Sequence, residues 1–144
     1  MALWQFDFYI VPRDKCMIVE GLEDEDILSW KQNSISLIEI DFLEKTPNWT
    51  EDIVQYGKAD ETCIQFLYED EALEEISCRF DLRSLSKKML EKILDYVEKI
   101  NGMIFYEGKI HAPKINEIIE LMKSSKANKF CQNPMNFLEE LSNN

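Results

Sequence analysis

Three stretches of the chain alternate apolar and polar residues with the two-residue period of a β-strand. Residues 3–12 do so for part of their length and end at Pro12, which predicts a strand that stops there. Residues 62–69 and 73–82 repeat the pattern on either side of a short turn at 70–72, which is typical of a β-hairpin. These segments predict the framework of a sheet.

The apolar positions of the predicted hairpin also indicate its register. Ile64 and Phe66 share one face of the first strand. Ile76 and Cys78 share one face of the second strand, so matching the apolar faces pairs even-numbered with even-numbered residues. This register places Cys63 on the face opposite to Cys78, and we therefore expect free thiols here. The four cysteines of the chain contain no C-x-x-C pair.

A different period, that of an amphipathic helix, runs through the later part of the chain. Residues 86–100 repeat apolar side chains every three or four positions, and Asn101-Gly102 supplies a stop. A second helix is predicted to begin at Pro113, and a third at Asn133-Pro134. The predicted buried stripe of the second helix consists of Ile115, Ile118, Ile119 and Met122.

Residues 13–57 give mixed signals. The acids at 23–26 are typical of the first turn of a helix that continues through 27–30. Residues 34–43 fit either a strand or a second helix, and Thr50 is predicted to cap a short helix that follows it.

Together these elements predict an α+β fold in a single domain spanning residues 1–144. Residues 103–106 indicate one more short strand, and we interpret residues 109–112 as its continuation. The expected architecture is an antiparallel sheet of about four strands in the ferredoxin-like order βαββαβ, with two extra C-terminal helices. A further strand at 34–43 would break that order.

Charge is distributed unevenly along the chain. Residues 1–81 hold 20 acids and 6 bases, a net charge of 6 − 20 = −14, whereas residues 82–144 hold 8 acids and 10 bases, a net charge of +2. A field of one sign attracts partners of the opposite sign and repels nucleic acid. The sequence therefore predicts a basic protein partner, and no nucleic-acid partner.

Several other classes of protein are disfavoured. No stretch reaches the roughly 18 apolar residues of a membrane span, and residues 1–7 do not resemble a secretory signal, so we expect a cytoplasmic protein. The four glycines cannot form a phosphate-binding loop. His111 is the only histidine, and nothing around it marks a catalytic or zinc site. We therefore expect no enzyme, no catalytic residues, no metal and no cofactor.

Two features allow both a structural and a functional interpretation. Arg79, Asp81 and Arg83 fall on one face of the predicted strand, as an ion-pair ladder or as a fork that binds a partner's carboxylate. The aromatic residues Trp30 and Trp49 lie in the acidic part of the chain, where each either covers the core or anchors an interface.

A combination of three stretches resembles the immunity proteins encoded beside polymorphic toxins, which are small acidic bacterial proteins. The resemblance covers roughly residues 49–141. It implies a cytosolic protein that binds and silences one cognate toxin. The stretches are Trp49 to Tyr56-Gly57; Tyr68-Glu69-Asp70 followed by Ile76 and Arg79-Phe80-Asp81-Leu82-Arg83; and Ser125 to Phe130 followed by Asn133-Pro134 and Phe137-Leu138.

The leading hypothesis is a non-enzymatic inhibitor, monomeric or homodimeric, whose acidic surface faces a basic toxin such as a nuclease. Two alternatives remain: a small enzyme that uses carboxylates and His111 in a pocket, or a structural module that dimerises through a strand edge. The predicted contact surface of the inhibitor consists of Glu23, Asp24, Asp26, Trp30, Trp49, Glu51 and Asp52.

Overall fold

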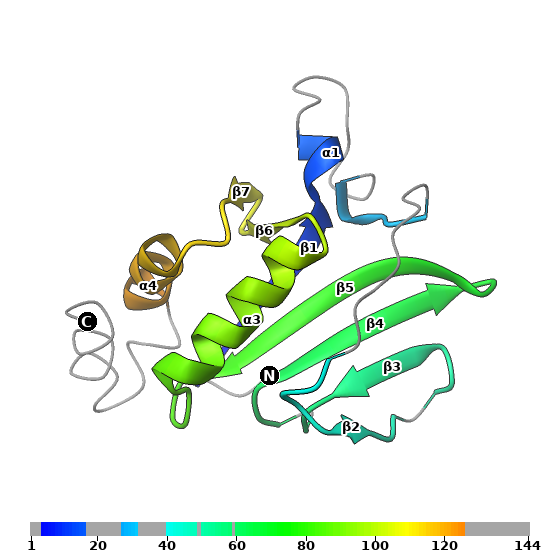
Figure 1. The fold of residues 1–144 in the computed structure, drawn as a ribbon, viewed down its shortest axis with the longest axis horizontal. Helices are drawn as coiled ribbons and strands as arrows, with labels where there is room; N and C mark the ends of the chain where they lie inside the picture. The colour runs from blue at the N-terminus through cyan, green and yellow to red at the C-terminus, as the bar shows by residue number, and fades with distance from the viewer. Residues whose placement is uncertain (1–3, 17–26, 32–39, 49, 59, 126–144) are drawn as a thin grey trace.

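The described residues of the protein form one antiparallel sheet of seven strands in the order β2-β3-β4-β5-β1-β6-β7 (Figure 1). The structure is a computed structural model that describes residues 4–16, 27–31, 40–48, 50–58 and 60–125. The strands are β1 (Gln5–Pro12), β2 (Lys45–Thr46), β3 (Ile53–Tyr56), β4 (Cys63–Glu69), β5 (Ala72–Asp81), β6 (Gly102–Tyr106) and β7 (Lys109–His111). The helices that lie wholly within the described residues are α1 (Arg13–Cys16), α3 (Lys87–Lys99) and α4 (Ile115–Ser124).

The expected four-stranded ferredoxin-like core is wrong, because the sheet contains additional strands in the region after residue 44. The short helix predicted after Thr50 is instead a turn, in which the Thr50 hydroxyl accepts a hydrogen bond from the backbone N–H of Asp52 at 3.2 Å. The residues that follow form β3, which pairs with both β2 and β4. Their β-branched and aromatic side chains suit a strand better than a helix.

The predicted continuation of β6 is also wrong. Glu107 and Gly108 have φ values of +48° and +77°, so the chain reverses there and β7 pairs antiparallel with β6. Two consecutive residues with positive φ are typical of a tight hairpin turn.

The predicted central hairpin is confirmed as β4 and β5. Ile64 lies opposite Cys78 and Phe66 opposite Ile76, as the apolar pattern indicated. Cys63 and Cys78 are buried free thiols. Burial raises the pKa of both, which disfavours the reactive thiolate form.

The main predicted helix is confirmed as α3. Ser86 caps it, since its hydroxyl accepts a hydrogen bond from the Met89 N–H at 3.1 Å, and Asn101 follows its end with a φ of +58°. The second helix begins two residues later than predicted, at Ile115, and buries most of the expected stripe. Of the strand or helix predicted at 34–43, residues 34–39 lie outside the described residues, and residues 40–43 form neither a strand nor a helix. The helix predicted from 133–134 lies outside the described residues.

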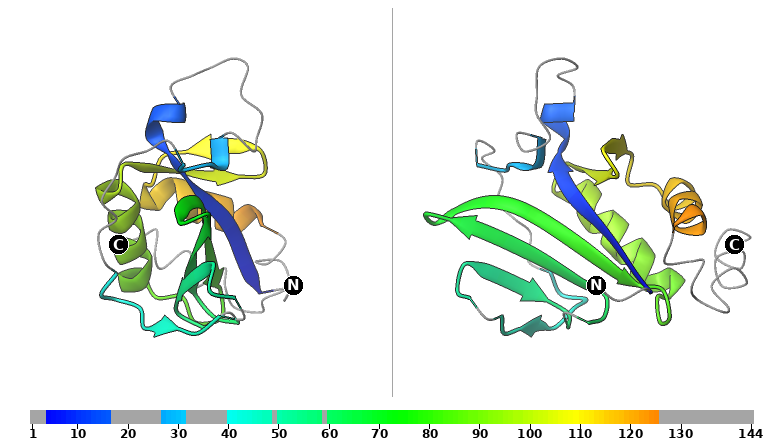
Figure 2. Two further views of the ribbon diagram at one scale, coloured as in Figure 1. Left: turned by 90° about the vertical axis from the view of Figure 1, so that its right-hand side faces the viewer. Right: turned by 180° about the vertical axis from the view of Figure 1, so that it is seen from behind.

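The two faces of the sheet differ. Helix α3 packs over one face, where alternate residues of β1, β4, β5 and β6 form the core with it (Figures 1 and 2). No described helix packs on the opposite face over β3, β4, β5 and β1. We call this second surface the helix-free face, and its side chains are those of Asp7, Tyr9, Gln55, Cys63, Gln65, Leu67, Glu75, Ser77 and Arg79.

Candidate functional site

Carboxylates from two separate turns meet at one end of the sheet. The N–H of Tyr68 donates a hydrogen bond of 2.8 Å to the backbone carbonyl of Asp52, which sets the β2–β3 turn beside the β4–β5 turn. Neighbouring strands lie about 4.8 Å apart, so the acids of both turns share one local field. We call this group the acidic end; it consists of Glu51, Asp52, Glu69, Asp70, Glu71 and Glu74.

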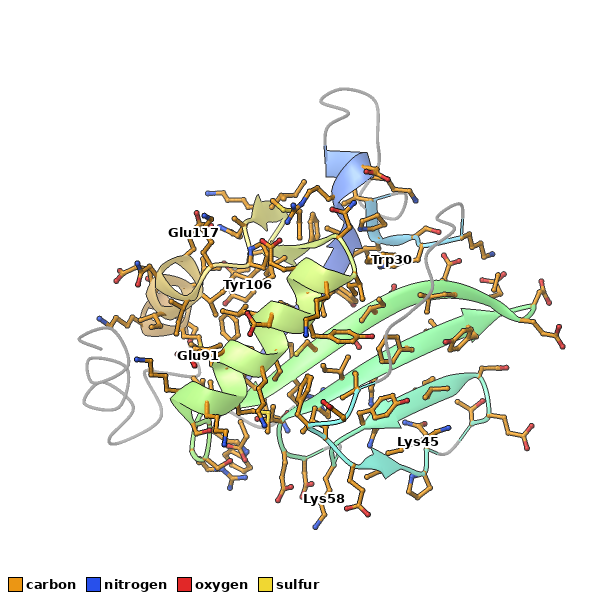
Figure 3. All side chains as sticks on the ribbon, in the orientation of Figure 1. Trp30, Lys45, Lys58, Glu91, Tyr106 and Glu117 are labelled. Atoms are coloured by element: carbon orange, nitrogen blue, oxygen red, sulfur yellow. The ribbon has the colours of Figure 1, made fainter. Side chains whose placement is uncertain are left out.

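Within the described parts of the chain, Lys31 is the base that forms ion pairs in the acidic end. Its ammonium group lies 3.4 Å from a carboxylate oxygen of Glu69 and 3.3 Å from one of Glu74. The hydrogen bond to Glu74, together with the bond to Glu69 and the charges of both acids, raises the pKa of Lys31. Among the described residues, six carboxylates against one ammonium leave this end strongly anionic. Figure 3 shows the oxygen-tipped side chains that gather at the tip of β4 and β5.

Trp30 positions Lys31 and is itself part of the core. Its indole N–H donates to the carbonyl of Ile10 at 2.9 Å, and its backbone N–H donates to the carbonyl of Glu74 at 2.9 Å. The side chain is only 2% exposed, so it packs in the core and does not form the exposed anchor that the sequence allowed.

The structure brings together part of the predicted contact surface. Glu51 and Asp52 are exposed and belong to the acidic end. The other predicted members, Glu23, Asp24, Asp26 and Trp49, lie outside the described residues. Sequence reasoning missed the acids of the β4–β5 turn. The predicted hairpin was the available signal, but without β3 nothing connected that turn to Asp52.

The β4–β5 turn holds Glu71 in an unfavourable backbone conformation. Asp70 and Glu71 have φ values of +52° and +67°, a region that Asp tolerates but that costs Glu71 roughly 1–2 kcal/mol. The comparable two-residue turn between β6 and β7 has Gly108 at its second position. The acidic turn therefore carries both backbone strain and repulsion between adjacent like charges.

We expect the substitution Glu71→Gly to stabilise the protein by about 0.5–1 kcal/mol, because glycine adopts positive φ without strain and one repulsive charge is lost. The reciprocal change Gly108→Glu is the matched control: a Cβ at that position meets no atom within 4 Å, and the change adds both the backbone strain and a like charge beside Glu107. It should destabilise by a similar amount. Urea unfolding measures both, and a loss of stability in Glu71→Gly would contradict the strain argument.

The arginines of β5 and the loop after it form ion pairs within the chain. The Nε of Arg79 donates to a carboxylate oxygen of Asp7 at 2.8 Å across the strands. Arg83 donates from Nε and Nη2 to the two carboxylate oxygens of Asp81, each at 3.0 Å, and its guanidinium lies 3.8 Å from the ring centre of Trp4. These contacts confirm the ion-pair interpretation of this motif.

A shallow hollow of about 300 Å³ lies on the helix-free face. Tyr9, which is 37% exposed, lies opposite Ser77, and Ser77 lies opposite Gln65. The Gln65 amide donates to the side-chain oxygen of Gln55 at 2.6 Å, which extends this polar row to β3. The hollow is lined by Asp7, Phe8, Tyr9, Cys63, Gln65, Ser77, Cys78 and Arg79.

A second hollow, of about 200 Å³, contains His111 between β6, β7 and α4. Ser124 also lines it, but the Ser124 hydroxyl donates to the carbonyl of Glu120 at 3.0 Å, within its own helix. Among the described residues no hydrogen bond joins Ser124 to His111, so the structure does not show the serine–histidine contact that an activated nucleophile needs. Among the described residues, no group of three His, Cys, Asp or Glu side chains could hold a metal ion.

Tyr106, at the rim of this hollow, should make stability fall at alkaline pH. Burial, followed by the charge of Glu107, raises the pKa of Tyr106 from 10.0 to about 12. A raised folded-state pKa gives stability that is present below pH 10 and lost as the pH approaches 12.

Raising the pH from about 9 to about 11 should lower the free energy of unfolding less in Tyr106→Phe than in the wild type. The difference between the two proteins should be below about 1 kcal/mol, because solvent screens the partly buried phenol. Urea unfolding at the two pH values measures the difference. Equal losses in the two proteins would contradict this assignment.

Comparison with protein-family models, with curated proteins and with solved structures finds no match to this chain. Within the described ranges, none of the helices has the length and apolar character that a membrane crossing requires.

Proposed function

We propose that the chain is a stoichiometric binding protein that captures a basic protein partner at the acidic end of its sheet. The observation that carries this proposal is the convergence of the β2–β3 turn with the β4–β5 turn, fixed by the bond between Tyr68 and Asp52. An anionic patch of this kind speeds encounter with a basic surface and discriminates against acidic ones.

The strained turn supports the same conclusion. Glu71 occupies a conformation in which Gly is far more favourable, so the fold gives up stability to present a carboxylate there beside that of Asp70. Strain of this kind concentrates at binding and catalytic sites. The arrangement of Ser124 and His111 offers no comparable support for an enzyme.

The form of binding that we favour is immunity-type inhibition: a cytoplasmic protein that occupies the basic active-site surface of one cognate toxin, such as a nuclease. The resemblance in residues 49–141 and the net charge of −12 both agree with this role. A toxin that cleaves nucleic acid has a basic cleft, which the acidic end would fill in place of the substrate.

The test is co-expression with the protein encoded by the neighbouring gene. We expect that protein to arrest growth when it is expressed alone, and the wild-type chain to restore growth and form a 1:1 complex with it. If the neighbouring protein is harmless and does not bind the chain, the inhibitor proposal fails.

Two variants make the test specific. The neutral-end variant removes four charges with Glu51→Gln, Asp52→Asn, Asp70→Asn and Glu71→Gly, and it should lose rescue. The control variant removes four charges elsewhere, with exposed acids changed by Glu44→Gln, Asp60→Asn, Glu61→Gln and Asp95→Asn, and it should retain rescue. Equal rescue by the two would show that the position of the charges does not matter.

A further inference from the structure

The helix-free face runs into the acidic end through Tyr9 and Glu75. Tyr9 on β1 lies opposite Ser77, and Glu75 is two residues away on the same face of β5, so the ring and the carboxylate are diagonal neighbours. Among the described residues, Tyr9 is one of two large hydrophobic side chains that are substantially exposed. An exposed ring beside a carboxylate is a surface suited to a cation.

Glu75 is a half-buried carboxylate whose negative charge no neighbouring positive group offsets among the described residues. Within the described ranges it has no ion-pair or hydrogen-bond partner, in contrast to Asp7, which is paired with Arg79. Burial, followed by the charge of Glu74, raises the pKa of Glu75. A cation placed beside Glu75 would offset both effects, which makes this position more receptive than the exposed acids of the turn.

We propose that Tyr9 and Glu75 form a subsite for an arginine side chain of the basic partner. The guanidinium plane stacks on the exposed ring of Tyr9 and donates hydrogen bonds to the Glu75 carboxylate. This inference rests on the proposed function and specifies the residue type that the partner presents. Arginine fits better than lysine, because its planar group can stack and form a forked pair at once.

The adjoining hollow explains why the partner's arginine binds beside Glu75 and not inside the hollow itself. Its charged lining residues, Arg79 and Asp7, already form an ion pair at 2.8 Å and add no net charge. The arginine is therefore drawn to the Glu75 side of Tyr9. The hollow of about 300 Å³, with Gln65 and Ser77 in its lining, remains for a neutral neighbour of that arginine.

The test is an NMR titration of the full chain with a tetra-arginine peptide at low salt, with tetra-lysine for comparison. We expect tetra-arginine to shift the amide signals of Tyr9, Glu75 and Ser77 and to bind more tightly than tetra-lysine. Tyr9→Leu and Glu75→Gln should each weaken binding by about two- to fivefold. Tyr9→Phe, which keeps the ring, should bind more tightly than Tyr9→Leu, and Asp95→Asn on α3 should bind as the wild type does.

The outcomes separate this subsite from the acidic end. If tetra-arginine does not bind, or if Tyr9→Leu and Glu75→Gln bind it as the wild type does, the subsite does not exist. If only the neutral-end variant binds tetra-arginine more weakly than the wild type, the subsite is excluded and the proposed function still stands. If Tyr9→Leu binds tetra-arginine more weakly while the neutral-end variant still restores growth in the co-expression test, the subsite is supported and the role of the acidic end is contradicted. Thermal unfolding of each variant confirms that it is folded.

Discussion

Replacing Phe6 by alanine should destabilise the protein by about 3–5 kcal/mol. Phe6 is 1% exposed and lies at the centre of the aromatic core beneath α3. Its ring stacks on that of Tyr106 with centroids 4.6 Å apart, and it contacts Phe80 at 6.3 Å. The truncation removes these contacts and leaves a cavity that the backbone cannot readily close, because Phe6 is held in the sheet opposite Phe80 of β5.

Chemical unfolding in urea measures this loss as a change in the midpoint at constant slope. The control is Tyr9→Ala on the same strand, where the side chain points to the helix-free face and a cost below about 1 kcal/mol is expected. If the two substitutions cost the same, the assignment of a buried and an open face to β1 is wrong.

The neutral-end variant should associate with its partner about 10- to 100-fold more slowly than the wild type at low salt. It reduces the net charge from −12 to −8, and so does the control variant, so that only the position of the charges differs. The partner for this measurement is the protein encoded by the neighbouring gene, and stopped-flow mixing at several salt concentrations gives the rates.

The expected stability of the neutral-end variant separates an effect on binding from an effect on folding. Its Asn-Gly turn suits the positive φ values of positions 70 and 71, so we expect it to unfold at a higher urea concentration than the wild type. Slower binding in a more stable protein cannot be attributed to misfolding. The rate difference should also narrow as added salt shortens the Debye length from about 10 Å at 0.1 M to about 3 Å at 1 M.

The long periodic elements could be predicted from the sequence because their signals are local. The helix α3 repeats its apolar residues over 13 residues, and the hairpin of β4 and β5 matches two alternating segments across a short turn. The strands β2 and β3 could not be predicted in this way, since two and four residues are too few to show a period. Their pairing depends on contacts between segments.

The candidate site was only partly predictable for the same reason. Glu51 and Asp52 were identified as candidate contacts, but their approach to the β4–β5 turn follows from the pairing of Ile53 with Leu67, which no local pattern reveals. Trp30 shows the converse case. An aromatic residue in an acidic stretch looks like an interface anchor until the bond from its indole N–H to Ile10 places it in the core.

Hydrogen–deuterium exchange on the complex would locate the binding surface directly. We expect the partner to slow exchange mainly at residues 50–53 and 68–75, which contain the two turns of the acidic end, and to leave α3 and α4 unchanged. Protection confined to α3 and α4, with both turns exchanging as in the free protein, would contradict the claim that the acidic end is the binding surface.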